Sequence, residues 1–144
     1  MSKKVMNRNR TINGTHGSAI WDGEKLSNIK SMDAKVNMSY EEVLQAEKLE
    51  TGYKYTGYSI TGTVVLYKID SFAAEKLEEG IKSGVMPEGT FITALEDPAA
   101  YGHERVEITG VVFDEMALMK FELGQLTEEE MPFKATGFRF LDKI

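Results

Sequence analysis

The sequence predicts a mainly β protein, an antiparallel β-sandwich or barrel of about seven strands with one flanking α-helix. Two long segments, 26–38 and 58–69, alternate polar and apolar residues, as strands with one buried and one solvated face do. A helical stripe and several shorter segments of strand composition follow. Two such long strands, separated by the charged segment 39–57, fit a subunit that pairs strands with its neighbours.

The composition is typical of one soluble globular domain, with 144 residues of which 28% are charged and 42% hydrophobic. The chain has no Cys, which excludes disulfides, Cys metal sites and Cys nucleophiles. No apolar stretch reaches the length of a membrane span, and the positive N-terminus lacks the apolar core of a signal peptide. We expect a basic N-terminal arm, 1–16, and a single domain, 17–144.

The net charge of −6 is unevenly distributed along the chain. The first ten residues carry Lys3, Lys4, Arg8 and Arg10, so the remainder carries a net charge of −10. An acidic body argues against a nucleic-acid-binding surface. The basic arm either contacts an acidic partner surface, including a second copy of this chain, or is a frayed polar terminus.

The early part of the chain predicts a hairpin followed by the two long strands. The apolar run 18–21 precedes Asp22-Gly23, a strong turn signal, and the first long strand is expected from Leu26. In both long strands the apolar and polar residues have opposite parity. The apolar set is Leu26, Met32, Ala34, Val36 and Met38, then Tyr58, Ile60, Val64 and Leu66; the polar set is Ser27, Ser31, Asp33, Lys35 and Asn37, then Ser59, Thr61 and Thr63.

The segment 39–57 gives two conflicting signals. Ser39-Tyr40-Glu41-Glu42 is a capping-box pattern, good helix formers follow, and Gly52 is a natural stop, so local propensity favours a helix over 40–50. Residues 53–56 return to strand composition. Both conformations stay open for this segment.

One helix is clear. Asp70 or Ser71 can cap it, and Gly84 ends it. An apolar stripe and a charged face follow from the spacing. The stripe is Phe72, Ala73, Ala74, Leu77 and Ile81, and the charged positions are Glu75, Lys76, Glu78, Glu79 and Lys82.

The second half of the chain predicts four further strands. They are expected at 90–95, at 105–114, at 117–123 and at 133–141. In 117–123, Met119, Phe121 and Leu123 alternate with Lys120 and Glu122. The parity of the last strand slips near Gly137, which predicts a bulge.

The sequence indicates no enzyme and no cofactor. His16 and His103 lie in loops near glycines, and no nucleotide loop, nucleophile elbow or paired-His zinc motif is present. The acidic run 128–130 lacks the Ca²⁺ loop pattern and is expected as a solvated turn. Trp21 is expected in the core, whereas Tyr53 and Tyr55 on the interrupting segment indicate a protein contact.

Several short segments carry a family resemblance in a fixed order. They are GSAIWDGEK at 17–25, TGYKYTG at 51–57 followed by Thr61-Gly62-Thr63, Glu104-Arg105-Val106, Val112-Phe113-Asp114, and EEMPF at 129–133. Together they resemble the tail tube (core) protein of contractile-tailed phages, of PBSX-like defective prophages and of contractile phage-tail-like bacteriocins. The basic first ten residues lie outside the resemblance.

The resemblance implies a structural role. Family members form a β-sandwich with a flanking helix, six subunits join into a ring whose inner wall is a continuous β-barrel, and rings stack into a hollow tube inside a contractile sheath. The expected partners are therefore further copies of the chain, the sheath protein, and baseplate and tail-terminator proteins. DNA would pass through the lumen, if at all, without specific binding. Assembly is expected in the bacterial cytoplasm, and the product is a phage tail or an extracellular bacteriocin particle driven through the target envelope when the sheath contracts.

The predicted surfaces follow from this architecture together with the strand pattern. The segment 39–57 is expected to contact the next ring, with a helical form in the free chain and an extended form in the tube. The lumen-facing set is Ser27, Ser31, Asp33, Lys35, Asn37, Ser59, Thr61 and Thr63; the inter-ring set is Glu41, Glu42, Glu47, Lys48, Tyr53, Lys54 and Tyr55; the sheath-facing set is Glu75, Glu78, Glu79 and Lys82.

Two other classes of protein remain as alternatives. A monomeric small-ligand-binding β-barrel needs a closed apolar cavity within one chain, and the polar face of the long strands argues against it. A hydrolase on a β-sandwich needs an acid, a base and a nucleophile, and no such set is visible.

Overall fold

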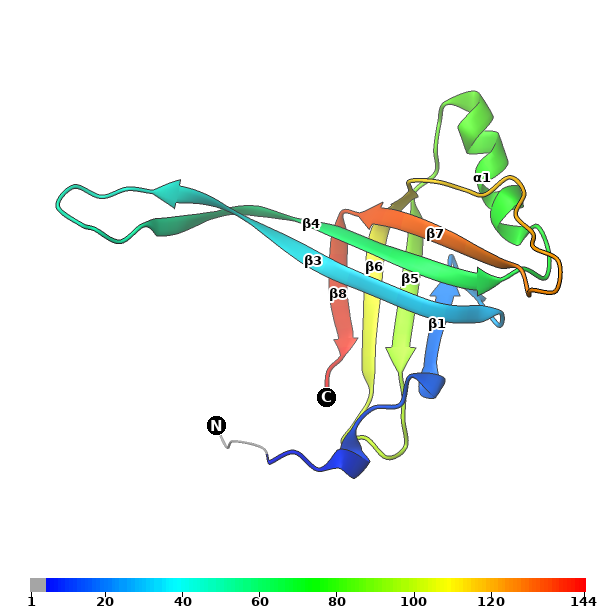
Figure 1. Ribbon diagram of the computed structural model, residues 1–144, viewed down its shortest axis with the longest axis horizontal. Helices are drawn as coiled ribbons and strands as arrows, with labels where there is room; N and C mark the ends of the chain where they lie inside the picture. Colours follow the sequence, from blue (N-terminus) through cyan, green and yellow to red (C-terminus); the bar gives the residue numbers. More distant parts are fainter. Residues whose placement is uncertain (1–4) are drawn as a thin grey trace.

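A computed structural model describes residues 5–144, and within them it contains eight β-strands and one α-helix (Figure 1). The predicted fold class, a mainly antiparallel β protein with one flanking helix, is confirmed. Two 3₁₀ turns, Arg8–Arg10 and Gly14–His16, come first. The elements that follow are β1 (Gly17–Trp21), β2 (Glu24–Lys25), β3 (Ile29–Val43), β4 (Gly52–Tyr67), α1 (Phe72–Ser83), β5 (Gly89–Leu95), β6 (Glu104–Phe113), β7 (Glu128–Ala135) and β8 (Gly137–Asp142).

The strands form two layers that cross each other in Figure 1. One sheet has the order β2-β1-β5-β6-β8, and the other has the order β7-β4-β3. Strand β6 joins them, because its early residues pair with β5 and β8 whereas Val112 and Phe113 pair with β7. Gly110, with a φ of 67°, lies at the change of sheet, where a Cβ atom would collide with the Thr136 hydroxyl.

The first hairpin forms as predicted. Asp22 and Gly23 connect β1 to β2 with φ values of 50° and 86°. Positive φ at both central residues is the requirement of the tight turn that suits antiparallel strands. Asp22 also accepts a hydrogen bond from the Thr90 backbone N–H at 2.8 Å, which ties this turn to the start of β5.

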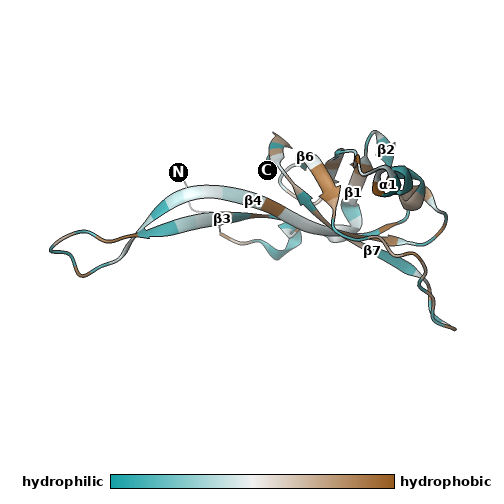
Figure 2. Ribbon diagram, turned by 90° about the horizontal axis from the view of Figure 1, so that it is seen from above, coloured by the Kyte–Doolittle hydropathy of each residue, from teal (hydrophilic) through white to brown (hydrophobic). Residues whose placement is uncertain are grey.

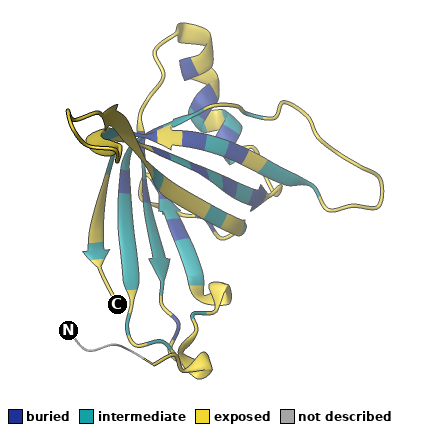
Figure 3. Ribbon diagram, turned by 60° about the vertical axis from the view of Figure 1, so that its left-hand side comes forward, coloured by how far each residue is buried: buried dark blue, intermediate teal, exposed yellow. Residues whose placement is uncertain are grey.

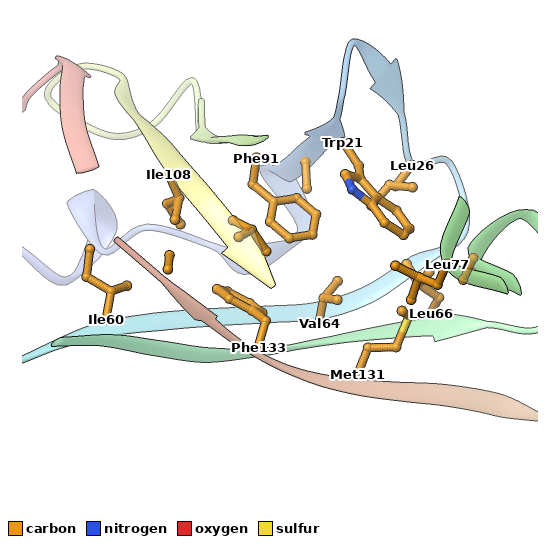
Figure 4. Packing of buried hydrophobic residues seen from close by; sticks show 14 residues of the cluster. Trp21, Leu26, Ile60, Val64, Leu66, Leu77, Phe91, Ile108, Met131 and Phe133 are labelled. Atoms are coloured by element: carbon orange, nitrogen blue, oxygen red, sulfur yellow. The ribbon is translucent and has the colours of Figure 1, made fainter. Parts of the chain in front are cut away.

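An aromatic cluster fills the space between the two sheets (Figure 4). Trp21, only 2% exposed, packs edge-on against Phe72 of the helix and Phe113 of β6, with ring centroids 5.5 and 5.1 Å apart. Phe91 and Phe133, one from each sheet, pack with ring planes tilted by 45° and ring centroids 5.4 Å apart. The prediction that Trp21 belongs to the core is confirmed.

The burial pattern confirms the alternation only where the long strands cover the core, because Ala34, Met38 and Tyr58 have the apolar parity but are exposed. Ile60, Val64 and Leu66 of β4 face the other sheet and are buried, and Met32 and Val36 lie directly opposite Val64 and Ile60 on β3. The start predicted for the strand is three residues early. Leu26 is buried in the turn before β3, where its N–H donates to the Ala19 carbonyl, and the strand begins at Ile29.

The helix that local propensity favours over 40–50 is absent. The register of β3 with β4 continues from Ser39 to Val43, opposite Gly57 to Gly52. An isolated helix of this length is marginal in water, whereas continued pairing with a strand already in register adds backbone bonds at little extra cost. The segment is therefore an extended hairpin in the single chain, so the expectation of a helix in the free chain is wrong.

Helix α1 covers one end of the sandwich. It buries Ala73, Leu77 and Gly80, and it ends at Gly84, which adopts a φ of 80° as predicted. Phe72 packs on the core, but Ile81 is 53% exposed, so its place in the apolar stripe is wrong. The chain after the helix returns across Gly80, close enough that a Cβ atom there would lie 2.8 Å from Pro87.

Two predictions for the last third need correction. The strand expected over 117–123 does not form, and these residues lie in the long connection between β6 and β7. The strand expected over 133–141 is divided, because β7 begins earlier, at Glu128, and the chain crosses at Thr136 to the other sheet as β8. The acidic residues 128–130 therefore belong to a strand rather than a turn. The parity slip near Gly137 marks this change of sheet.

Candidate assembly surfaces

The tip half of the β3–β4 hairpin projects from the body without any covering element (Figures 1 and 2). Strand β7 pairs with β4 only from Ile60 to Tyr67, so residues 37–59 form a two-stranded ribbon. Every residue of this ribbon and its loop is exposed except Gly57, which is half-buried (yellow in Figure 3). A two-stranded ribbon is marginally stable alone in water. We define residues 37–59 as the bare hairpin.

Aromatic and aliphatic side chains lie on the bare hairpin. Tyr40 and Tyr55 pack edge-on across it, with ring centroids 5.8 Å apart. A bulge interrupts the ladder nearby, since Ser39 pairs with Gly57 and Tyr40 with Tyr55, and Thr56 donates its hydroxyl to the Ser39 carbonyl at 3.1 Å. The other large apolar side chains exposed here are Met38, Val43, Leu44, Leu49, Tyr53 and Tyr58. Such a density of exposed apolar groups is typical of a contact surface.

The residues predicted to contact the next ring are all on this hairpin. Glu41, Glu42, Tyr53, Lys54 and Tyr55 lie on its two strands, and Glu47 and Lys48 lie in the loop at its tip. All seven are exposed. The fold thus brings all seven residues together on the part of the hairpin that projects from the sandwich (Figure 1).

A polar face lies on the outer side of the β3–β4–β7 sheet. The register places Asp33 opposite Thr63, Lys35 opposite Thr61 and Asn37 opposite Ser59, all on the side away from the core. The Asn37 side-chain amide donates to the Thr61 hydroxyl at 2.9 Å. Ser31 shares this face, whereas Ser27 lies in the turn between β2 and β3, before the strand on which it was expected.

Strand β7 adds charged residues to the same face, which the sequence reasoning missed. Glu128, Glu130 and Lys134 lie opposite Tyr67, Val65 and Thr61 of β4. The available signal was the alternation of Met131, Phe133 and Ala135, all buried, with these charged neighbours. Glu128 forms an ion pair with Lys30, and its hydrogen bond and negative charge raise the pKa of Lys30. The outer face therefore carries both signs of charge.

The charged face of α1 points away from the body. Glu75, Glu78, Glu79 and Lys82 are exposed and border one shallow surface, as the helical spacing predicts. Lys82 and Glu78 lie one turn apart with Nζ and Oε1 2.7 Å from each other. This hydrogen bond, together with the opposite charge, lowers the pKa of Glu78 and raises that of Lys82.

The described part of the N-terminal arm lies against the loop between β5 and β6. The Arg10 guanidinium donates to the Ala99 carbonyl and lies 5.1 Å from the Tyr101 ring. Asp97 accepts backbone N–H bonds from Asn13 and Ala99, both at 2.8 Å, and these bonds hold its pKa below the usual range. Lys3 and Lys4 lie outside the described residues.

The connection between β6 and β7 exposes a second group of apolar side chains. Five of them are between 71% and 92% exposed, namely Leu118, Met119, Phe121, Leu123 and Leu126. The ladder between the two strands stops where Asp114 donates to the Pro132 carbonyl, and no strand pairs with the residues that follow. The sequence reasoning found the alternation of 117–123 but placed it in a strand of the single chain.

Within residues 5–144 no cluster of His, Asp and Glu could hold a metal ion, and no helix is long and apolar enough to cross a membrane. His16 lies 3.9 Å from Asp97, and His103 is exposed in a loop. A cleft of about 690 Å³ lies between the sheets, but exposed residues such as Lys35 and Phe140 line it, so it is not a closed ligand cavity.

A bare hairpin, an extended polar sheet face and unpaired sheet edges are what a protein needs in order to assemble with others, and this is the architecture of a structural subunit. The chain belongs to the phage tail tube protein family, whose family model matches residues 4–142. It is 32% identical to the phage-like element PBSX protein XkdM of Bacillus subtilis (strain 168), over all of this chain and 97% of that protein. The resemblance seen in the sequence is confirmed, and with it the role of a tube subunit.

Solved structures agree on the fold. The tube-terminating cap of the anti-feeding prophage superposes with a TM-score of 0.77 over 99% of this chain and 97% of that chain, at 9% identity. A chain of the sheath–tube complex of an extracellular contractile injection system, in its extended state, superposes with a TM-score of 0.70 over 90% of each chain, at 10% identity. The comparisons give no support to a small-ligand carrier.

Proposed function

We propose that copies of this chain join side by side into hexameric rings and that the rings stack into the hollow inner tube of a contractile tail or tail-like particle. When the sheath that surrounds the tube contracts, the tube is driven through the envelope of a target cell. Assembly takes place in the bacterial cytoplasm, and the product is a phage tail or a released bacteriocin particle.

The bare hairpin is the observation that carries this proposal. It exposes Met38, Val43, Leu44 and Leu49 besides its tyrosines, and none of its residues belongs to the buried core. Contact with an adjacent ring would bury Tyr53 and Tyr55 together with the charged residues Glu41, Glu42, Glu47, Lys48 and Lys54. The inter-ring role of the hairpin is inferred from this exposure together with the stacking of rings that the resemblance implies.

The polar outer face of β3, β4 and β7 forms the wall of the bore. Asp33, Lys35, Asn37 and Thr61 can remain in water there while the opposite face of the same strands stays in the core. The mixture of acidic and basic residues gives no strong attraction for phosphates, so DNA passes without specific binding. The exposed helix face, with Glu75, Glu78, Glu79 and Lys82, contacts the sheath.

Sedimentation velocity and negative-stain electron microscopy of the purified full chain test this proposal. We expect rings and tubes that increase with protein concentration, because association buries the bare hairpin. Addition of the sheath protein of the same particle should decorate the tubes. A strict monomer at millimolar concentration, under every salt condition tried, would overturn the proposal.

A further inference from the structure

We propose that the segment 117–123 forms a β-strand on the free edge of β3 of a second copy of this chain, so that it closes the ring and covers the cleft between the sheets. This inference rests on the proposed ring and names the two segments that join its subunits. Three features carry it: the free edge of β3, the cleft below that edge, and the exposed segment 117–123. Within the described chain, neither the edge nor the segment has a strand paired with it.

The first feature is the edge of β3. Strand β3 is the last strand of its sheet and pairs only with β4, so one side of its 15-residue backbone has no strand beside it. A long edge with free N–H and C=O groups is a template for another strand. Its apolar face also lacks cover, since Ala34 and Met38 are exposed although they belong to the core side of the strand.

The second feature is the cleft below that edge. Met32, Ala34 and Val36 of β3 line one wall, and Phe138 and Phe140 of β8 line the other. The two Phe side chains remain 42% and 43% exposed. A strand added beside β3 would place alternate side chains over this cleft.

The third feature is the segment 117–123 itself. Met119, Phe121 and Leu123 have one parity and Lys120 and Glu122 the other, which is the pattern of a strand with one apolar face. The segment is exposed and pairs with no strand of its own chain. It therefore carries the apolar face that the cleft lacks.

The position of the segment makes a second copy its partner. It begins beside the end of β7, where Val112 and Phe113 pair with Lys134 and Phe133, and it returns to the start of β7 at Glu128. It thus lies at the edge of the sheet opposite to β3. Contacts between two different edges of one sheet are head-to-tail, and they close into rings under rotation.

The direction of pairing also follows. Strands β3 and β7 run in the same sense, because each is antiparallel to β4. The end of β6, from which the segment continues, is antiparallel to β7, and the segment is taken to keep that direction. Rotation about a ring axis preserves these senses. The segment of one copy therefore meets β3 of the next as an antiparallel strand.

Charges limit the register. With Phe121 opposite Met32, Lys120 faces Asp33, and with Phe121 opposite Val36, Glu122 faces Lys35. The intermediate register, with Phe121 opposite Ala34, sets Glu122 against Asp33 and Lys120 against Lys35. Like charges directly opposite each other are unfavourable, so the two outer registers are the ones allowed.

Disulfide cross-linking tests the pairing, since the natural chain has no Cys. The two allowed registers place Ala34 opposite Met119 or opposite Leu123, and directly opposite residues are close enough for a disulfide. We expect one of the variants Ala34→Cys/Met119→Cys and Ala34→Cys/Leu123→Cys to give a ladder of covalent oligomers on non-reducing gels after assembly and mild oxidation. All charged residues are kept in these variants.

The control is Ala34→Cys/Leu126→Cys, because Leu126 is as exposed as Met119 and Leu123 but lies outside the alternating segment. It should remain monomeric on the gel. Absence of a ladder from both test variants, in samples that form tubes, would overturn the inference and leave the proposed function intact. A ladder from Ala34→Cys/Phe121→Cys alone would also overturn it, since that is the excluded register. Failure of the natural chain to form rings at all would instead overturn the proposed function.

A second measurement does not depend on cross-linking. Phe121→Ser should raise the protein concentration needed for ring formation by about tenfold or more, the effect of one large apolar side chain left in water. Leu126→Ser should leave that concentration unchanged. Equal effects of the two substitutions would contradict a specific role for the segment.

Discussion

The two halves of the β3–β4 hairpin share their strands and their pairing, yet they differ in what lies against them. In the covered half, from Ile29 to Val36 and from Ile60 to Tyr67, β4 has β7 on its other side, and alternate residues enter the core. In the bare hairpin the same ladder continues with no third strand beside it and with exposed side chains, although Tyr58 at its base packs edge-on against Phe138 of β8. Backbone pairing alone therefore extends the hairpin, whereas only the covered half contributes the burial that stabilises the fold.

Removal of a core aromatic ring should have the largest effect on stability. Phe133 is 1% exposed, lies opposite Gly62 on β4 and packs against the rings of Phe91 and Phe113. Phe133→Ala should lower the free energy of unfolding by about 3–5 kcal/mol, measured by urea denaturation, because it removes a large apolar side chain and leaves a cavity. A loss below about 1 kcal/mol would mean that the covered half does not carry the burial assigned to it.

Alanine substitution of two glycines in β4 allows a direct comparison of packing in the two halves of the hairpin. A Cβ atom on Gly62, in the covered half, would lie 2.6 Å from Phe133 Cζ and closer still to the Asp33 carbonyl oxygen. Gly62→Ala should therefore cost about 1–3 kcal/mol of unfolding free energy, as overpacking does. Gly52, at the tip of the same strand, has only the Val43 carbonyl oxygen within 4 Å of such an atom, at 3.5 Å.

Gly52→Ala is the matched control and should change the free energy of unfolding by less than about 0.5 kcal/mol. The same urea titration measures both variants. Similar costs at the two positions would show that the bare hairpin is packed as closely as the covered half.

Low pH should destabilise the fold through protonation of Asp97. The backbone N–H groups of Asn13 and Ala99 lower the folded-state pKa of Asp97, so its ionised form stabilises the fold above the ordinary carboxyl pKa of about 4. This contribution is lost as the pH falls through the lowered value. Asp97→Asn should thus reduce the urea midpoint at pH 7, and the difference from the natural chain should shrink as the pH falls below the ordinary carboxyl pKa. A difference that grows toward low pH would contradict this assignment.

The covered half and the body of the sandwich were the parts of the molecule that the sequence could predict. Alternation in β3 and β4, the Asp22-Gly23 turn and the end of α1 at Gly84 depend on local chemistry and on one buried face, and all three are as expected. Ile81 was misplaced because the helix packs on the body only through its first turns and Gly80. The division of the last strand depends on a contact between Thr136 and Gly110, which are remote in sequence.

The candidate surfaces were harder to predict, because their conformation depends on partners. Local propensity over 40–50 favours a helix. The segment forms a hairpin because the pairing register of the covered half continues into it. The segment 117–123 has the pattern of a strand, but within the described residues it pairs with no other strand. A segment with the alternation of a strand, but with no strand paired to it in the described fold, indicates a contact made on assembly.

Replacement of hairpin tyrosines should have the smallest effect on stability and a large effect on assembly. Tyr53 and Tyr55 are exposed, and neither touches the core. The double variant Tyr53→Ser/Tyr55→Ser should keep the unfolding free energy of the natural chain within about 0.5 kcal/mol. Electron microscopy should show single rings in place of tubes, since the lost apolar area belongs to the contact between rings.

Tyr101→Ser is the control, because Tyr101 is similarly exposed but lies outside the hairpin, in the loop between β5 and β6. It should leave tube length unchanged. If the double variant forms tubes of normal length, the exposed tyrosines of the bare hairpin do not take part in the contact between rings. That contact would then have to lie elsewhere. A loss of rings as well as tubes would place the tyrosines in the contact between neighbours within a ring, the contact we assign to the segment 117–123 and the edge of β3.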